Sequence, residues 1–332
     1  MSYELRAGEN LGEGVRRVCC EQIKGAAAAS RAKTKADVSP VHETRRHLKK
    51  ARAALRLMAR HVRPGDLKAE AAKLRDVGRL ISDVRDAEVR LQTVQDLRRR
   101  RGGLRGDRDL AETEDLLALE LESFRAAFSH WPGETQKELT AVRRRIAAWS
   151  LIHLDCKQIR LVVQSTYKRG REMLATAQSH PTADNFHEFR KQVKELTFHL
   201  RILRPLHPPT FERFSDDLKT LGAHLGKAND LAFLEKRLSA LHGRGTTADE
   251  PKNLHGVIDR RREELQKEAA QLGAKFYKLR AREFGNCIAV HFEAWHLANE
   301  KCGNSQMRPA GSNGAARPRP RRRRQRAAPV TR

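Results

Sequence analysis

The chain has 332 residues and a formal net charge of +26, from 67 Lys and Arg against 41 Asp and Glu. The stretch 301–332 holds ten basic residues and no acid, which leaves 57 against 41, or +16, in the first 300 residues. Such a charge favours a polyanionic partner, whose binding would be driven largely by the release of counterions. The length allows one large or two modest hydrophobic cores.

Cysteine usage and the lack of long apolar runs indicate the compartment. The five cysteines form no CxxC pair and no Cys/His cluster at zinc-site spacing, so we expect ordinary thiols in a reducing cytoplasm. The start, MSYELRAGEN, is not a basic segment followed by an apolar one. No run approaches the ~20 apolar residues that cross a bilayer. We therefore predict neither secretion nor a membrane span.

Helical periodicity is nearly continuous, and alternating runs of β-branched and aromatic residues are rare, so we predict an all-α fold. Gly, Pro and polar clusters separate the predicted helices at 29–39, 63–65, 101–108, 131–133, 179–184, 205–209 and 242–251. Asp37 or Ser39, and later Asp184, are candidate N-terminal caps of the helices that follow them.

A helical signature occurs twice, at 41–57 and 186–202, separated by 145 residues. One face of each copy is apolar at steps of three and four, through Val41, Thr44, Leu48, Ala51, Leu55 and Met58, and through Phe186, Phe189, Val193, Leu196, Leu200 and Leu203. The other face carries His42, Arg45, Lys49, Arg52 and Arg56, and then His187, Arg190, Lys194 and Arg201, with Thr197 interrupting. We expect the first face in a core and the second against an anion.

The duplication continues beyond the signature, because residues 74–91 align with 218–235. This alignment places Gly78 on Gly222 and Asp86 on Asp230. We predict two halves, 5–150 and 151–300, that pack as similar helical bundles about an approximate twofold axis. The two histidine helices would then face each other across that axis. The aspartates are expected to cap a helix or fix a basic side chain.

These residues resemble the conserved-histidine α-helical domain (CHAD) family over nearly all of 5–300. Both copies have the family's histidine, the arginine three residues on and further cations at helical steps, as His42, Arg45, Lys49, Lys50 and Arg52, and as His187, Arg190, Lys191 and Lys194. The family's later Leu-Gly-x-x-Arg-Asp element appears as 81–86 and 225–230. The resemblance implies two helical bundles with internal symmetry that enclose a basic cavity, which binds inorganic polyphosphate.

The chain departs from the family pattern at three positions. Ser82 replaces a glycine, and Asn229 and Thr197 stand where the family has arginine. Two of these departures lie in the second half. We therefore expect the second half to bind phosphate less strongly than the first.

We predict a non-enzymatic polyphosphate-binding protein, without cofactor or metal, that attaches to or organises polyphosphate granules in the cytoplasm. The predicted site consists of His42, Arg45, Lys49, Arg52, Arg56 and Arg85 in the first half and His187, Arg190, Lys191, Lys194 and Arg201 in the second, with Arg46 and Lys50 at the rim. Residues three and four apart lie ~5–6 Å apart at Cβ, so one helix face can meet successive phosphates. Arginine can hold two oxygens at once, and lysine acts as a point charge.

The two histidines carry a hypothesis of their own. Among so many cations a free imidazole, whose reference pKa is ~6.5, is shifted toward its neutral form. A bound phosphate reverses that shift. We therefore expect His42 and His187 to become protonated on binding, and the affinity to fall from mildly acidic to mildly alkaline pH. A flat profile that His42→Ala with His187→Ala leaves unchanged would contradict this.

Three other functions were weighed. A zinc protease needs histidines four residues apart, and His42 and His47 are five apart. A metal-dependent polyphosphate hydrolase needs paired carboxylates beside the cations, yet Glu43 and Glu188 are single acids. Nonspecific binding of nucleic acid stays open, because phosphate contacts require no aromatics. Its best candidate is the Arg-rich, Pro-rich tail 303–332, which is predicted to be disordered.

Overall fold

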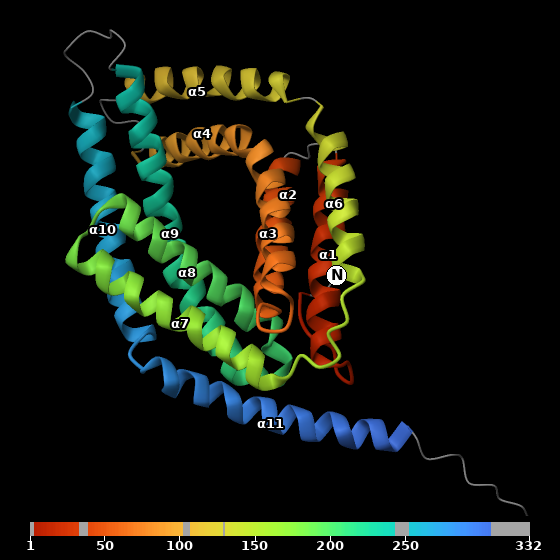
Figure 1. The fold of residues 1–332 in the computed structure, drawn as a ribbon. Coiled ribbons are helices and arrows are strands. Elements are labelled where there is room, and N and C mark those ends of the chain that lie inside the picture. The colour runs from red at the N-terminus through yellow and green to blue at the C-terminus, as the bar shows by residue number, and fades with distance from the viewer. Residues whose placement is uncertain (1–2, 33–38, 102–106, 129, 243–251, 307–332) are drawn as a thin grey trace, which may run out of the picture.

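A computed structural model describes residues 3–32, 39–101, 107–128, 130–242 and 252–306. All regular elements in these ranges are helices, which confirms the all-α class (Figure 1). The last helix continues to Gln306, so it includes the first four residues of the predicted tail. The rest of that tail lies outside the described residues.

The first half contributes α1 (Leu11–Ser30), α2 (Pro40–Leu57), α3 (Pro64–Leu80), α4 (Ser82–Arg101), α5 (Asp107–Ala127) and α6 (Trp131–Ala147). The second contributes α7 (Cys156–Ser179), α8 (Ala183–Ile202), the 3-10 turn η1 (Arg204–Leu206), α9 (Pro208–His242), α10 (Lys252–Phe276) and α11 (Ala281–Gln306). A shift of 145 residues places α1 on α7, α2 on α8 and α5 on α10, and makes α6 overlap α11. The same shift places α3 and α4 together on the single helix α9.

The break between α3 and α4 is the clearest difference between the two halves. The predicted breaks at 63–65 and 101–108 do not include this one, which falls at Ile81, whose ψ is 18°. The hydroxyl of Ser82 donates to the carbonyl of Arg79 at 2.6 Å, which satisfies a helix-end acceptor. Fully buried Ile81 packs in a small core with Val41 and Val84. The break turns α4 across the end of α2 (Figure 1).

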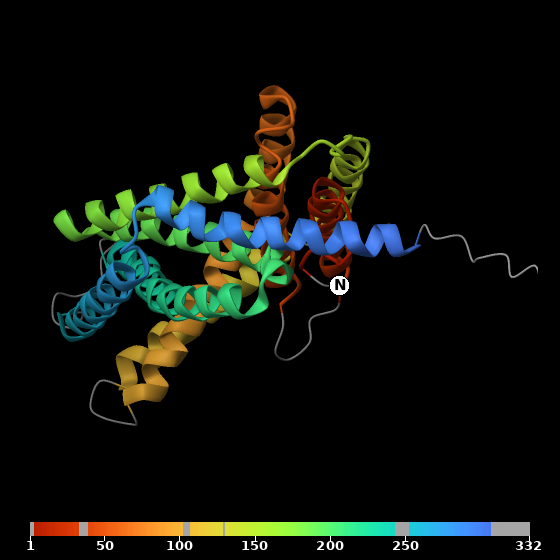
Figure 2. The ribbon, with the colours of Figure 1, turned by 90° about the horizontal axis from the view of Figure 1, so that it is seen from below.

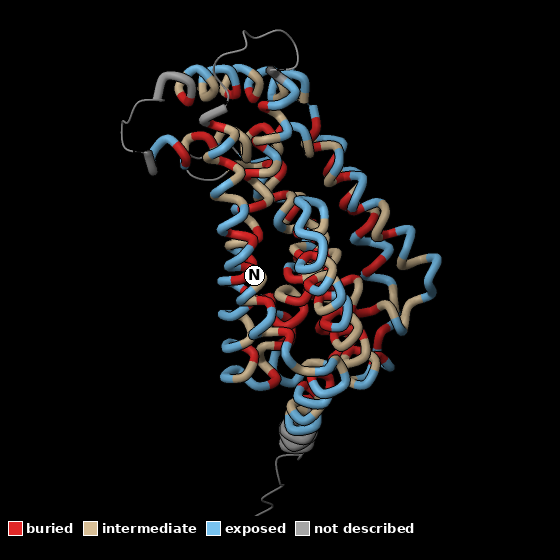
Figure 3. Tube along the Cα trace, turned by 90° about the vertical axis from the view of Figure 1, so that its left-hand side faces the viewer, coloured by how far each residue is buried: buried red, intermediate tan, exposed pale blue. Residues whose placement is uncertain are grey.

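Both predicted apolar stripes are buried, which confirms their assignment to a core. Every member is at most 6% exposed: Val41, Thr44, Leu48, Ala51, Leu55 and Met58 on α2, and Phe186, Phe189, Val193, Leu196, Leu200 and Leu203 on α8. Most of them belong to one large cluster shared with α1, α7 and α11. Buried positions alternate with exposed ones along each helix, as amphipathic packing requires (Figure 3).

A second core lies where α4 and α5 pack against α9 and α10. It joins Val94, Leu97, Leu110 and Leu117 of the first half to Ala228, Leu231, Leu234, Leu238, Leu254, Ile258 and Leu265 of the second. The two halves therefore meet twice, once here and once where α2 packs on α8. Helix α11 runs along α7 on the outer side (Figure 2).

A hydroxyl side chain caps the N-terminus of each signature helix. The sequence predicted this cap for α2 but not for α8. Ser39 caps α2, because its hydroxyl accepts from the backbone N–H of His42 at 3.4 Å. For α8 the predicted cap, Asp184, is wrong, since it lies inside the first turn. Thr182 takes that role and accepts from Asn185 N–H at 3.2 Å. An acid in the first turn still favours the positive end of the helix dipole.

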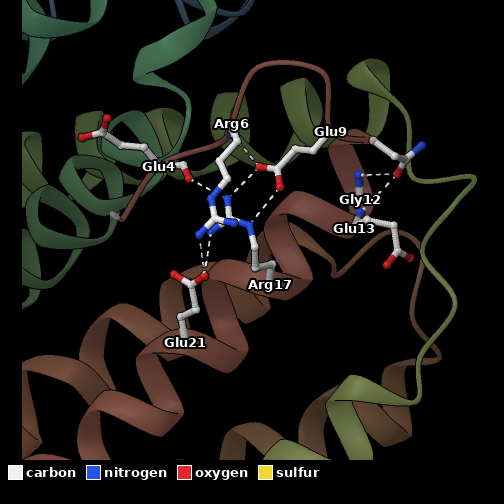
Figure 4. Close-up of polar contacts among 8 residues, drawn as sticks. Glu4, Arg6, Glu9, Gly12, Glu13, Arg17 and Glu21 are labelled. Atoms are coloured by element: carbon white, nitrogen blue, oxygen red, sulfur yellow. Dashed lines mark hydrogen bonds and ion pairs between the residues drawn. The ribbon is translucent and has the colours of Figure 1, made fainter. Parts of the chain in front are cut away.

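The segment before α1 ties the two halves together. Leu5 N–H donates to the carbonyl of Ile202 in α8 at 3.0 Å, and buried Tyr3 donates to the carbonyl of Lys50 in α2 at 2.9 Å. Arg17 of α1 holds the segment in place through the carboxylate of Glu9 at 2.7 Å and the backbone carbonyl of Glu4 at 2.9 Å (Figure 4). The segment before α1 thus bonds to both α2 and α8 and helps to hold them together.

Tyr3→Phe is expected to lower the free energy of unfolding by about 1 kcal/mol, the typical worth of one buried hydrogen bond. Chemical denaturation measures the change. Tyr277→Phe is the matched control, because the buried hydroxyl of Tyr277 has no hydrogen-bond partner and its removal costs little or nothing. Equal losses for both variants would contradict a role for the Tyr3 hydroxyl.

Candidate functional site

Four helices form a closed circuit of contacts, in which α2 packs on α4, α4 on α9, α9 on α8 and α8 on α2. The helices α2 and α8 cross in their C-terminal halves. There the imidazole Nε2 of buried His199 lies 3.1 Å from the carbonyl oxygen of Ala53. The circuit brings helices of the first and second halves to one place (Figure 1).

Lys49 of α2 shows most directly how the cations converge. Burial and, after it, the charges of Arg190, Arg45, Arg85 and Lys194 together lower the pKa of its ammonium to about 8. Two of these four cations come from α8 and one from α4. We call the group the cationic cluster: His42, Arg45, Lys49, Arg85, Arg190 and Lys194.

Lys49 and Lys194 are exposed to solvent, yet burial is the largest cause of their lowered pKa values. Both statements hold for a side chain that reaches water while protein surrounds it on several sides. For Lys194 the neighbouring charge of Arg190 lowers the pKa as well, and Asp230 opposes the shift. The two lysines are equivalent under the 145-residue shift.

Arg45 and Arg190 form the second equivalent pair of the cluster. Arg45 donates from Nη1 to the carbonyl of Gly78 in α3 at 3.0 Å. Arg190 has a buried Nε without a hydrogen-bond partner. Burial lowers the pKa of each guanidinium, and an aspartate opposes the shift, Asp86 for Arg45 and Asp230 for Arg190. Asp86 lies inside α4 and Asp230 inside α9, so the prediction that they cap a helix is wrong, and the prediction that they fix basic side chains stays a prediction.

The two histidines have different neighbours. Burial lowers the pKa of His42, and the charge of Arg85 on α4 lowers it further. His187 instead lies with Nδ1 2.5 Å from Oδ1 of Asn229, and its ring meets Phe233 edge-on at 6.4 Å between centroids. Asn229 aligns with Arg85 when 218–235 is placed on 74–91. The substitution of arginine by asparagine therefore removes one cation from the second half and gives its histidine a neutral partner.

The C-terminal part of the α2 face carries Arg52 and Arg56, whose charged neighbours come from α3 and α8. Burial lowers the pKa of Arg52, and the charges of Arg56, Arg75 and Arg79 lower it further. Arg56 donates to Glu195 of α8 at 2.5 Å. Arg52 and Arg56 continue the face that carries Lys49, but they lie nearer to α3 and to the crossing with α8.

The remaining predicted residues are Arg46, Lys50, Lys191 and Arg201, and of these the charge of Arg46 acts on His42 of the cationic cluster. Arg46 pairs with Glu43, and Lys191 pairs with Glu188, each three residues away on the same helix. The charge of Arg201 acts on Lys50 and Tyr3 at the N-terminal segment. The signature therefore supplies residues to the cluster and also to the outer surface.

Sequence reasoning missed three cations near the α2 face: Arg75 and Arg79 on α3, and Arg169 on α7. They lie outside the duplicated signature, so no motif marks them. The helical phase of α3 could have placed Arg75 and Arg79 on one face, but only tertiary packing turns that face toward Arg52.

Metal sites and membrane spans were also sought among the described residues. No group of three or more His, Cys, Asp or Glu side chains there is placed to hold a metal ion. No described helix combines the length and apolar character that crossing a bilayer needs. Neither finding adds to the site.

The chain matches a protein-family model and is similar to a solved structure. A family model described as the CHAD domain matches residues 18–239. Among solved structures, the chain is similar to the crystal structure of the CHAD domain from the plant Ricinus communis, with a TM-score of 0.54, 17% sequence identity, and coverage of 89% of this chain and 94% of that chain. At this identity the likeness shows the fold alone. No curated protein matches the sequence.

Proposed function

Because this chain belongs to the CHAD domain family, we propose that it binds inorganic polyphosphate at the cationic cluster. The observation that carries the proposal is the position of Lys49, whose pKa is lowered by two cations of its own half and two of the other. Gathering like charges destabilises the free protein, and a polyanion relieves that cost. Helices from both halves would then hold one ligand.

The geometry suits a flexible chain of phosphates. Cations recur along one face of α2, so successive phosphates can meet successive side chains. The solvent access of Lys49 and Lys194 leaves them open to a ligand, and the protein around them strengthens each charge interaction. We place the basic cavity implied by the family at this point, between α2, α4, α8 and α9.

The proposal extends to the biological role. The chain binds polyphosphate without hydrolysing it and attaches to, or organises, polyphosphate granules in the cytoplasm. The charges of Asp86 and Asp230 act on Arg45 and Arg190, and we expect these acids to orient the arginines and not to hold a metal. Release of orthophosphate with magnesium or manganese, abolished by Glu43→Gln, would instead identify a hydrolase.

A competition experiment tests polyphosphate against nucleic acid. Long-chain polyphosphate is expected to displace duplex DNA from the full chain at matched charge concentration, while DNA displaces polyphosphate poorly, because the cluster presents point charges in a confined place. Fluorescence anisotropy with either ligand labelled measures both directions. Equal displacement in both directions would favour nonspecific polyanion binding.

A further inference from the structure

Glu195 stands next to Lys194 on α8 and contacts the cationic face of α2. Its side chain is buried, with 8% of the residue exposed. One carboxylate oxygen accepts from Arg56 Nη1 at 2.5 Å, and the other lies 3.5 Å from Arg169 Nη2. That second oxygen is buried and has no hydrogen-bond partner. One internal carboxylate therefore occupies two guanidinium groups.

The equivalent position in the first half carries the opposite charge. A shift of 145 residues places Lys50 on Glu195 and Arg56 on Arg201. Lys50 is buried, with 9% of the residue exposed, and the charge of Arg201 acts on it. The ammonium of Lys50 lies over the ring of Tyr3, 5.0 Å from its centroid. The same helix crossing thus accepts a cation in one half, so helix packing alone does not demand an acid at Glu195.

Glu195 lies where the cationic face of α2 would otherwise continue. Arg52 and Arg56 follow Lys49 at steps of three and four residues, so the three lie on one face. The negative charge of Glu195 also acts on Arg52 and opposes the effect of its cationic neighbours. Beyond the cluster, Arg56 and Arg169 pair with this acid, its charge acts on Arg52, and the charges of Arg75 and Arg79 act on Arg52 as well.

We propose that Glu195 ends the phosphate-binding face, because its carboxylate occupies Arg56 and Arg169 and so limits how many phosphate groups the site holds. This inference rests on the proposed function. A phosphate must displace a carboxylate that is already in place on the same chain, and it meets the negative charge of that carboxylate as it approaches. Glu195 is thus a residue that determines the preferred chain length.

Glu195→Gln tests the inference in the full chain by calorimetric titration with polyphosphates of defined length. Removing one negative charge beside the ligand is expected to raise the affinity for long chains about tenfold and to increase the number of phosphates bound per protein. Tripolyphosphate, which the cationic cluster accommodates alone, is expected to bind with nearly unchanged affinity.

Glu70→Gln is the matched control. Glu70 is 6% exposed and pairs with Arg145 at 2.5 Å, so its substitution removes an equally buried, arginine-bound carboxylate, from α3 and not from the site. Its effect on affinity is expected to be less than twofold at any length. In a Glu195→Gln background, Arg56→Gln should abolish the gain.

Glu195→Met provides a second route to the same result, because it removes the carboxylate while Arg56 and Arg169, whose side chains are exposed, stay solvated. Unchanged affinity for long chains in both Glu195 variants, with wild-type binding intact, would refute the role of Glu195 and leave the proposed function standing. Absence of polyphosphate binding in the wild type would instead overturn the proposed function itself.

Discussion

Replacing Lys49 and Arg190 together by alanine is expected to weaken the binding of long-chain polyphosphate about a hundredfold, because each cation contributes charge-assisted contacts to phosphate oxygens. Lys49 comes from α2 and Arg190 from α8, and the positive charge of Arg190 acts directly on Lys49. The double variant therefore removes one contact from each half. Calorimetric titration with polyphosphate of defined length measures the loss.

The control for this experiment removes the same two charges elsewhere. Lys267 on α10 and Arg282 on α11 are exposed and lie outside the cationic cluster. Lys267→Ala with Arg282→Ala is expected to change the affinity less than threefold, through net charge alone. Similar losses in the two double variants would show that the whole surface attracts the polyanion and that no site exists at the cluster.

The affinity for long-chain polyphosphate is expected to fall about thirtyfold between pH 7 and about 9.5. The direction of this change follows from the pKa of Lys49. In the free protein its pKa is about 8, below the usual value of 10.5. A bound phosphate raises that pKa, so binding above pH 8 requires the uptake of a proton. Each further unit of pH then reduces the affinity up to tenfold.

Lys49→Arg separates this effect from general charge loss. An arginine keeps its proton over the whole range, so the fall between pH 7 and about 9.5 should nearly disappear in this variant. A fall of the same size in Lys49→Arg would assign the pH dependence to other groups. His42→Ala with His187→Ala tests the part below pH 7, because the lowered pKa of His42 leaves that imidazole neutral until phosphate binds.

Much of the fold could be predicted from the sequence, because it depends on local periodicity. The apolar stripes on α2 and α8 fix which side of each helix is buried, and every predicted member is buried. The break at Ile81 could not be predicted in this way. The segments 74–91 and 218–235 have similar patterns, and only the burial of Ile81 against Val41 and the cap from Ser82 interrupt the first.

The candidate site was predicted in part. The signature named five of the six members of the cationic cluster, and the family's later element named Arg85. The prediction also included Arg46, which pairs with Glu43, Lys191, which pairs with Glu188, and Arg201, whose charge acts on Lys50. A helix stripe fixes a direction around one axis, and it does not fix which neighbour lies in that direction.

The sequence by itself determined the helices, their buried faces and the pairing of equivalent cations, because these follow from spacing along one chain. Only the tertiary structure decided which cations meet. Arg190 acts on Lys49 across 141 residues of sequence, since the crossing of α2 and α8 and the contact of α4 with α9 close one circuit. Electrostatic interaction depends on distance through space, and packing between the two halves sets that distance.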